Sequence, residues 1–177
     1  LKSFQNRLLL KSELENITED IATIRQILDN LVKISFDQEE VMKRAQKMSS
    51  YSASVSDVMR KQFEIKQSMK HIEDSLSSLA RRQAAVKPFI QKEVTKIQSN
   101  IETTQSELQN RRMSNAAKNQ QFALTSMNNL ALMLMESMSD MQEQQQQSQS
   151  KCNKAGNKSS CNKPGGKGKP KKASARE

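Results

Sequence analysis

Residues 10–31 read LKSELENITEDIATIRQILDNL, and this stretch decides the fold. Its large apolar residues recur at alternating steps of four and three, at Leu10, Leu14, Ile17, Ile21, Ile24, Leu28 and Leu31. In an α-helix this spacing places all of these side chains on one stripe, the seam along which helices supercoil around one another. The stretch therefore predicts a long helix packed lengthwise against other helices.

The same alternation returns in two later segments. One seam covers residues 55–86, with eight apolar positions out of ten, and the other covers residues 90–108. From this repetition we predict an all-α fold, an elongated antiparallel helical bundle with coiled-coil-like packing. The seam residues that we expect to carry the packing are Leu14, Ile21, Leu28, Ile65, Ile72, Leu79, Ile97, Leu130 and Leu134.

The composition favours narrow packing seams over a compact globular core. Apolar residues make up 34% of the chain and aromatic residues 3%, and there is no Trp. Pro88 is the only Gly or Pro in the first 150 residues. A globular domain of this length normally contains more aromatic bulk and more turn residues. Helices that pack through one stripe need neither.

The segment 1–147 is predicted to hold five helices, at about residues 2–33, 36–48, 54–86, 88–111 and 114–147. Ser35 marks the first boundary, because it resembles a helix N-cap that forms a capping box with Gln38. The serines of residues 49–54 mark the second boundary, since closely spaced serines compete for backbone hydrogen bonds. Pro88 fits the first turn of the fourth helix.

The last predicted helix differs from the others, because its apolar residues span more than one face. We therefore expect it to be central to the bundle, with neighbours on at least two sides. Six of the ten methionines lie in or beside this helix. An adaptable thioether suits an irregular core, and a methionine-lined groove for a partner is the alternative interpretation.

Residues 148–177 are predicted to form a disordered tail or linker, first Gln/Ser-rich and then Lys/Gly-rich. Nine of the chain's 29 basic residues and one acidic residue lie beyond residue 150, which leaves 20 basic and 18 acidic residues in the rest. Such a segment could attract nucleic acid or anionic lipid weakly and without specificity. The lysines expected to make these contacts are Lys163, Lys167, Lys169, Lys171 and Lys172.

Few residues offer groups for catalysis or metal binding. His71 is the only histidine and flanks a seam position, which favours a surface location. Cys152 and Cys161 alone cannot complete a four-coordinate zinc site, and both a disulfide and two free thiols remain open. The acidic residues alternate with Lys and Arg, which indicates ion pairs along helix faces. We therefore expect no enzymatic activity, no cofactor, no metal and no small-molecule substrate.

Four phrases of the sequence are similar, in the same order, to phrases of a known family. They are LVKISFDQE at 31–39, IEDSLSSL at 72–79, TSMNNLALML at 125–134 and CNKPGGKG at 161–168. The chain thus resembles the C-terminal half of a large Bacteroidetes family catalogued as a domain of unknown function. The resemblance implies a membrane-anchored protein with transmembrane helices near its N-terminus, a long Gln- and Met-rich helical region and more helix after the Gly-Lys segment. It implies no catalytic or ligand-binding residues.

These observations lead to a functional hypothesis. The longest apolar run covers residues 130–135, far shorter than the roughly 20 residues that cross a bilayer. Since the chain starts inside a helical pattern, we expect a fragment whose membrane anchor lies outside it, on an undetermined side of the membrane. The predicted function is a non-enzymatic scaffold of the cell envelope that binds itself or other envelope proteins through helix faces. The alternative is electrostatic binding of nucleic acid or anionic membrane through the basic tail.

Overall fold

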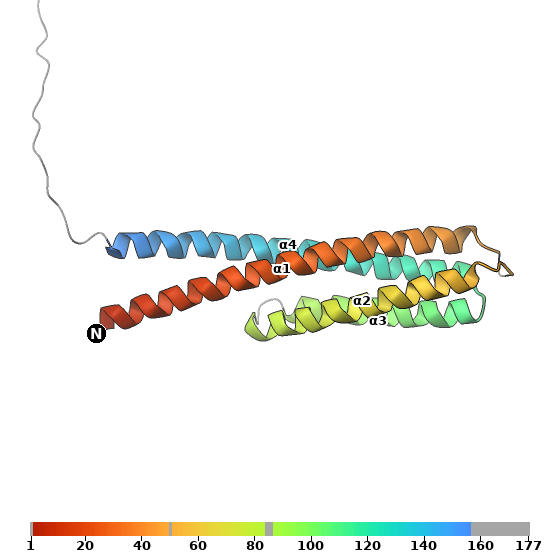
Figure 1. Cartoon of the computed structure of the whole chain (residues 1–177), viewed down its shortest axis with the longest axis horizontal. Helices are drawn as coiled ribbons and strands as arrows, with labels where there is room; N and C mark the ends of the chain where they lie inside the picture. Colours follow the sequence, from red (N-terminus) through yellow and green to blue (C-terminus); the bar gives the residue numbers. More distant parts are fainter. Residues whose placement is uncertain (1, 50, 84–86, 157–177) are drawn as a thin grey trace, which may run out of the picture.

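The computed structural model describes residues 2–49, 51–83 and 87–156, and the regular secondary structure in these ranges is entirely helical. The four helices of this part of the chain are α1 (Lys2–Lys47), α2 (Val55–Arg82), α3 (Lys87–Gln109) and α4 (Met113–Gly156). They lie lengthwise along one another in an elongated bundle, which confirms the predicted all-α class (Figure 1).

Each helix packs against two neighbours. α1 contacts α2 and α4, and α3 contacts α2 and α4, so the helices form a closed ring with α1 opposite α3 and α2 opposite α4. α1 and α4 span the full length of the bundle, whereas the hairpin of α2 and α3 covers only part of it (Figure 1). Among the described residues, one end of the bundle consequently has four helices, and the other end has only α1 and α4.

The core is a column of aliphatic side chains supplied by all four helices. Ile24, Leu76, Leu79, Ile97 and Leu130 are completely buried in it. Each such side chain contributes about 1.5–3 kcal/mol of burial free energy. Eight of the nine predicted seam residues are buried, and the ninth, Leu14, is half-buried.

The predicted boundary at Ser35 is wrong, because α1 continues unbroken through it. The Ser35 hydroxyl donates to the Val32 carbonyl at 2.8 Å, the bond of a serine inside a helix. Burial also continues past Ser35, since Ile34, Gln38 and Val41 are all buried, although two successive steps of three residues, from Leu28 to Leu31 to Ile34, shift the seam there. Packing therefore outweighs the capping signal, and the segments predicted at 2–33 and 36–48 are one helix of 46 residues.

The serine-rich segment between α1 and α2 does form the predicted break. The Tyr51 N–H donates to the Ser49 hydroxyl at 3.4 Å, and the Ser54 N–H donates to the Ser52 hydroxyl at 3.2 Å. These side-chain bonds satisfy backbone donors outside the helices, as expected for closely spaced serines. Pro88 lies in the first turn of α3, also as predicted.

α3 ends at Gln109, two residues before the predicted end. The chain closes the helix with Arg111 in the left-handed region, at a φ of 56°. The Arg111 N–H donates to the Leu108 carbonyl at 3.0 Å, and the Arg112 N–H donates to the Glu107 carbonyl at 2.8 Å. This pair of bonds is a Schellman motif, which is usually built on glycine.

α4 continues to Gly156, nine residues beyond the predicted end at residue 147. The prediction of disorder from residue 148 onward is thus wrong for residues 148–156. The five lysines expected to bind anionic surfaces lie outside the described residues, as does Cys161.

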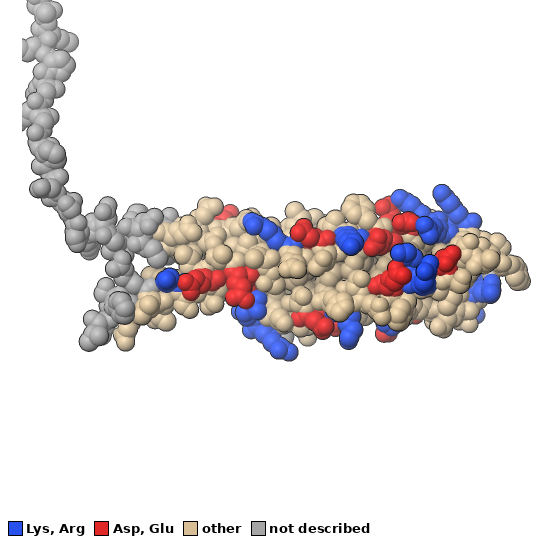
Figure 2. All heavy atoms as spheres, in the orientation of Figure 1, with Lys and Arg blue, Asp and Glu red and all other residues tan. Residues whose placement is uncertain are grey.

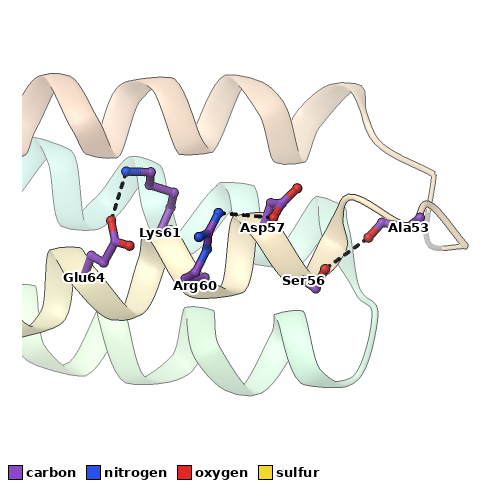
Figure 3. Close-up of polar contacts among 6 residues, drawn as sticks. All are labelled: Ala53, Ser56, Asp57, Arg60, Lys61 and Glu64. Carbon is purple, nitrogen blue, oxygen red and sulfur yellow. Dashed lines mark hydrogen bonds and ion pairs between the residues drawn. The ribbon is translucent and has the colours of Figure 1, made fainter.

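Charged side chains are distributed along the bundle with both signs interleaved (Figure 2). At the start of α2, Asp57 pairs with Arg60 at 3.3 Å and Lys61 pairs with Glu64 at 2.9 Å (Figure 3). Other exposed pairs, such as Glu39 with Lys43, join residues four positions apart on one helix face, as the alternation of charges predicts. Exposed pairs of this kind contribute about 0–1 kcal/mol each, so they favour solubility more than stability.

Candidate functional site: a buried glutamine layer and the surface cavities

Three glutamine side chains from three helices meet inside the aliphatic core. Gln38 of α1, Gln62 of α2 and Gln120 of α4 have no exposed surface, and we call them the glutamine layer. Each occupies a position on its helix that faces the bundle interior, where apolar residues precede and follow it. The layer lies in the four-helix half of the molecule, nearer to its loop end.

The three amides bond to one another. Gln38 Nε2 donates to Gln62 Oε1 at 3.2 Å, and Gln62 Nε2 donates back to Gln38 Oε1 at 2.9 Å. Gln120 Nε2 donates to the same Gln62 Oε1 at 2.8 Å. Gln62 is therefore the centre of the layer, and its bond to Gln120 crosses the bundle between two helices that otherwise do not pack together.

The layer is not fully satisfied by the described residues. Gln120 Oε1 and the hydroxyl of Thr104, a buried residue of α3, have no hydrogen-bond partner there. A buried polar group without a partner costs about 1–3 kcal/mol, so an aliphatic layer would be at least as stable. A buried amide instead penalises every register in which the glutamines do not meet, as polar residues at core positions do in coiled coils.

A second polar cluster holds the tip of the α2–α3 hairpin against α1. Asp20 is 1% exposed, and its Oδ1 accepts a bond from Arg82 Nε at 2.6 Å. Its Oδ2 accepts a bond from Gln83 Nε2 at 2.8 Å. Because both carboxylate oxygens of this buried acid accept hydrogen bonds from the end of the hairpin, its arrangement is that of a structural anchor.

Glu93 of α3 is a second buried acid. Its Oε1 accepts a bond from Lys96 Nζ at 2.7 Å, one turn along the same helix, and its Oε2 has no partner among the described residues. The described part of the chain has no group of three or more His, Cys, Asp and Glu side chains that could hold a metal ion.

The surface cavities are open and lined by few chemical groups. One cavity of about 960 Å³ lies at the end of the bundle with the α1–α2 and α3–α4 loops, between the last turn of α1 and the first turns of α4. Lys118 Nζ lies 5.9 Å from the ring centre of Phe122 beside it, a cation–π contact. A smaller cavity of about 330 Å³ lies between α2 and α3, against Phe63 and Ile101.

His71 is exposed, as predicted, and borders a shallow hollow between α1 and α2.

α4 packs against two helices, as predicted, but it is not central to the bundle, because Leu132 and Met135 are 65% and 53% exposed on its outer face. Apolar residues on several faces of α4 therefore reflect an uncovered surface as well as a core.

The sequence contained a partial signal for the glutamine layer. Gln62 interrupts an otherwise apolar seam at a position where the spacing requires burial. Gln38 fits a capping box with Ser35, a pattern that indicates a helix start and not a buried side chain. Gln120 lies in the polar run Asn119-Gln120-Gln121, and such a run gives no indication that one of its residues faces the bundle interior. Only the packing of three helices reveals that these side chains meet.

None of the described helices is long and apolar enough to span a membrane. No family model matches this chain, and no curated protein or solved structure is significantly similar to it.

Proposed function

We propose that this chain is a non-enzymatic scaffold, a rigid helical rod that sets a distance and presents helix faces to itself or to partner proteins. The observation that carries the proposal is the continuous aliphatic column inside the bundle, which fills the interior of the four-helix part with packing side chains. Where polar groups enter that interior, as in the glutamine layer, they bond mainly to one another.

The dimensions of the helices support this role. α1 has 46 residues and α4 has 44, so each is about 65–70 Å long. The two run in opposite directions and pack against each other along the four-helix part of the bundle, which stiffens the pair there. Such a rod suits a spacer in an envelope protein anchored by a segment outside this chain, the setting implied by the family resemblance.

Size-exclusion chromatography with light scattering and circular dichroism tests the proposal. The 20.1 kDa chain should be strongly helical and should have a hydrodynamic radius well above that of a sphere of its mass. A thermal-shift screen with divalent metals, nucleotides and sugar phosphates should leave its melting temperature unchanged. A compact particle, or specific stabilisation by one of these ligands, would contradict the scaffold proposal.

The basic tail favours a second candidate function, electrostatic binding of nucleic acid or anionic membrane. It is carried by the nine basic residues beyond residue 150, against one acidic residue. Deletion of residues 157–177 should then abolish binding to duplex DNA or to phosphatidylserine vesicles, and raising the salt concentration should weaken it steeply. Equal binding by the truncated chain would exclude this role for the tail.

A further inference from the structure

At the end of the bundle opposite the α1–α2 and α3–α4 loops, α1 and α4 extend beyond the α2–α3 hairpin, which does not cover them there. α2 ends level with Asp20, where Arg82 and Gln83 bond to that carboxylate. Residues 2–19 of α1 and 144–156 of α4 extend past this point and diverge from each other (Figure 1). We call these two segments the fork. A hollow of about 580 Å³ lies at its base, bordered by Ile17 and Gln144.

The packing seam of α1 continues into the fork without interruption. Ile21 and Ile24, beside the hairpin, are 6% and 0% exposed. Leu10, Leu14 and Ile17 keep the same spacing but are only half-buried, because α2 no longer covers them. Leu8 and Leu9 are also 53% and 62% exposed. The fork thus carries a helix-packing stripe that lacks a helix.

Residues 157–177 do not supply that helix. They contain no Leu, Ile, Val, Met or Phe, and seven of the 21 are Lys or Arg. Such a segment has no apolar side chains with which to cover a leucine stripe. An occupant of the fork needs an apolar stripe with matching steps of four and three, and α1 of a second copy presents such a stripe.

We propose that the fork is a self-association surface, on which a second copy of this chain packs through its own fork. A two-fold axis perpendicular to the rod makes α1 of one copy antiparallel to α1 of the other, so α1 of the second copy takes the place that α2 has beside α1. α4 of the second copy likewise takes the place of α3. All neighbouring helices in the joint are then antiparallel, as they are within one copy.

The two forks are identical, so they match in length. In the dimer, each fork overlaps only the part of the other copy that the α2–α3 hairpin leaves uncovered. The 18 residues of α1 in the fork span about 27 Å. The result is one longer rod, with two hairpin-containing bundles joined by a four-helix segment. Leu10 lies near the middle of the α1 segment, so the two Leu10 side chains lie close to the two-fold axis.

This inference rests on the proposed scaffold function and names its partner. Light scattering at increasing protein concentration should show a monomer of 20.1 kDa converting to a dimer of about twice that mass. Leu14→Asp should weaken dimerisation more than about tenfold, since the carboxylate would be buried only in the joint. Leu132→Asp, on the exposed outer face of α4, is the matched control and should leave dimerisation unchanged.

Cross-linking tests the same surface without relying on an acidic substitution. In a Cys152→Ser, Cys161→Ser background, Leu10→Cys should give a disulfide-linked dimer under mild oxidation. Phe36→Cys, at a position more exposed than Leu10 but outside the fork, should remain monomeric on a non-reducing gel.

The outcomes separate the two proposals. An elongated particle that stays monomeric at all concentrations overturns the fork proposal and leaves the scaffold intact. A dimer that Leu14→Asp does not weaken, or equal cross-linking at positions 10 and 36, also overturns the fork proposal. A compact particle overturns the scaffold and the fork proposal together.

Discussion

Gln62 is the residue on which the internal order of the bundle depends most. Its side chain exchanges two hydrogen bonds with Gln38 and accepts a third from Gln120. All three amides are fully buried, so water cannot replace a bond that is lost. The glutamine layer therefore gives a smaller free energy of unfolding than an aliphatic layer would, but it strongly favours one alignment of the helices.

Gln62→Ala should lower the free energy of unfolding by about 2–4 kcal/mol, because it leaves a cavity and two buried amides with unmet hydrogen bonds. Urea unfolding followed by circular dichroism measures the change. Gln67→Ala, an exposed glutamine on the same helix, is the control and should change stability by less than about 0.5 kcal/mol. Equal effects of the two substitutions would show that the layer contributes nothing.

Ile72 tests the core itself, because it is 3% exposed in the middle of α2. Ile72→Asp should abolish the cooperative thermal transition, since an unpaired buried carboxylate costs several kcal/mol. Leu132→Asp, at a position 65% exposed, should leave the melt nearly unchanged. A normal melt for Ile72→Asp would contradict the burial of this seam.

At the scale of single elements, α1 is the helix that the sequence misrepresents. A Ser at position 35 and a Gln at position 38 form a valid capping box in isolation. The same residues serve equally well inside a helix, where Ser35 bonds back to Val32. The spacing of the apolar residues through this region was the better guide, because burial along the seam outweighs a single cap.

Phe36→Pro distinguishes a continuous α1 from two helices. At the first position of a new helix proline would be tolerated, but within α1 it removes a backbone bond and clashes with the preceding turn, at about 3 kcal/mol or more. Phe36 is 67% exposed, so Phe36→Ala controls for loss of the side chain. Urea unfolding should show a large loss for proline alone, and equal stability of both variants would restore the predicted break at Ser35.

The α2–α3 hairpin is held at its tip by Asp20, a contact 62 residues apart in sequence. Asp20→Asn keeps the shape but removes the charge that strengthens two hydrogen bonds, so we expect a loss of about 1–2 kcal/mol. Hydrogen exchange should accelerate in the last turn of α2 and not in its first turn. Asp29→Asn, an exposed position on the same helix, should change neither, and unaltered exchange in Asp20→Asn would contradict the anchor.

Most of the elements could be predicted from the spacing of Leu, Ile and Met, because a stripe that must be buried specifies a helix and its inward face. The contacts between elements could not. Asp20 looks like any other acid on a solvated face until Arg82 and Gln83 are placed beside it. The outer leucine and methionines of α4 look like core until the ring of four helices leaves them outside.

At the scale of the whole molecule, unequal helix lengths shape the rod. The hairpin helices have 28 and 23 residues, whereas α1 and α4 have 46 and 44. Because α2 and α3 are both shorter than α1 and α4, this bundle ends in a two-helix fork, and the half-buried leucine stripe there offers a way to lengthen the rod by pairing copies end to end. A dimer joined in this way would have four helices in cross-section along its whole length.

Small-angle X-ray scattering of the chain in solution tests the lengthwise packing of the helices most directly. A compact domain of 177 residues has a radius of gyration of about 16 Å. The bundle should instead scatter as a rod, with a radius of gyration above about 20 Å and a cross-section about 20 Å wide, whether or not copies pair through the fork. A radius of gyration near 16 Å, or scattering without a rod-like cross-section, would contradict the structure on which every proposal depends.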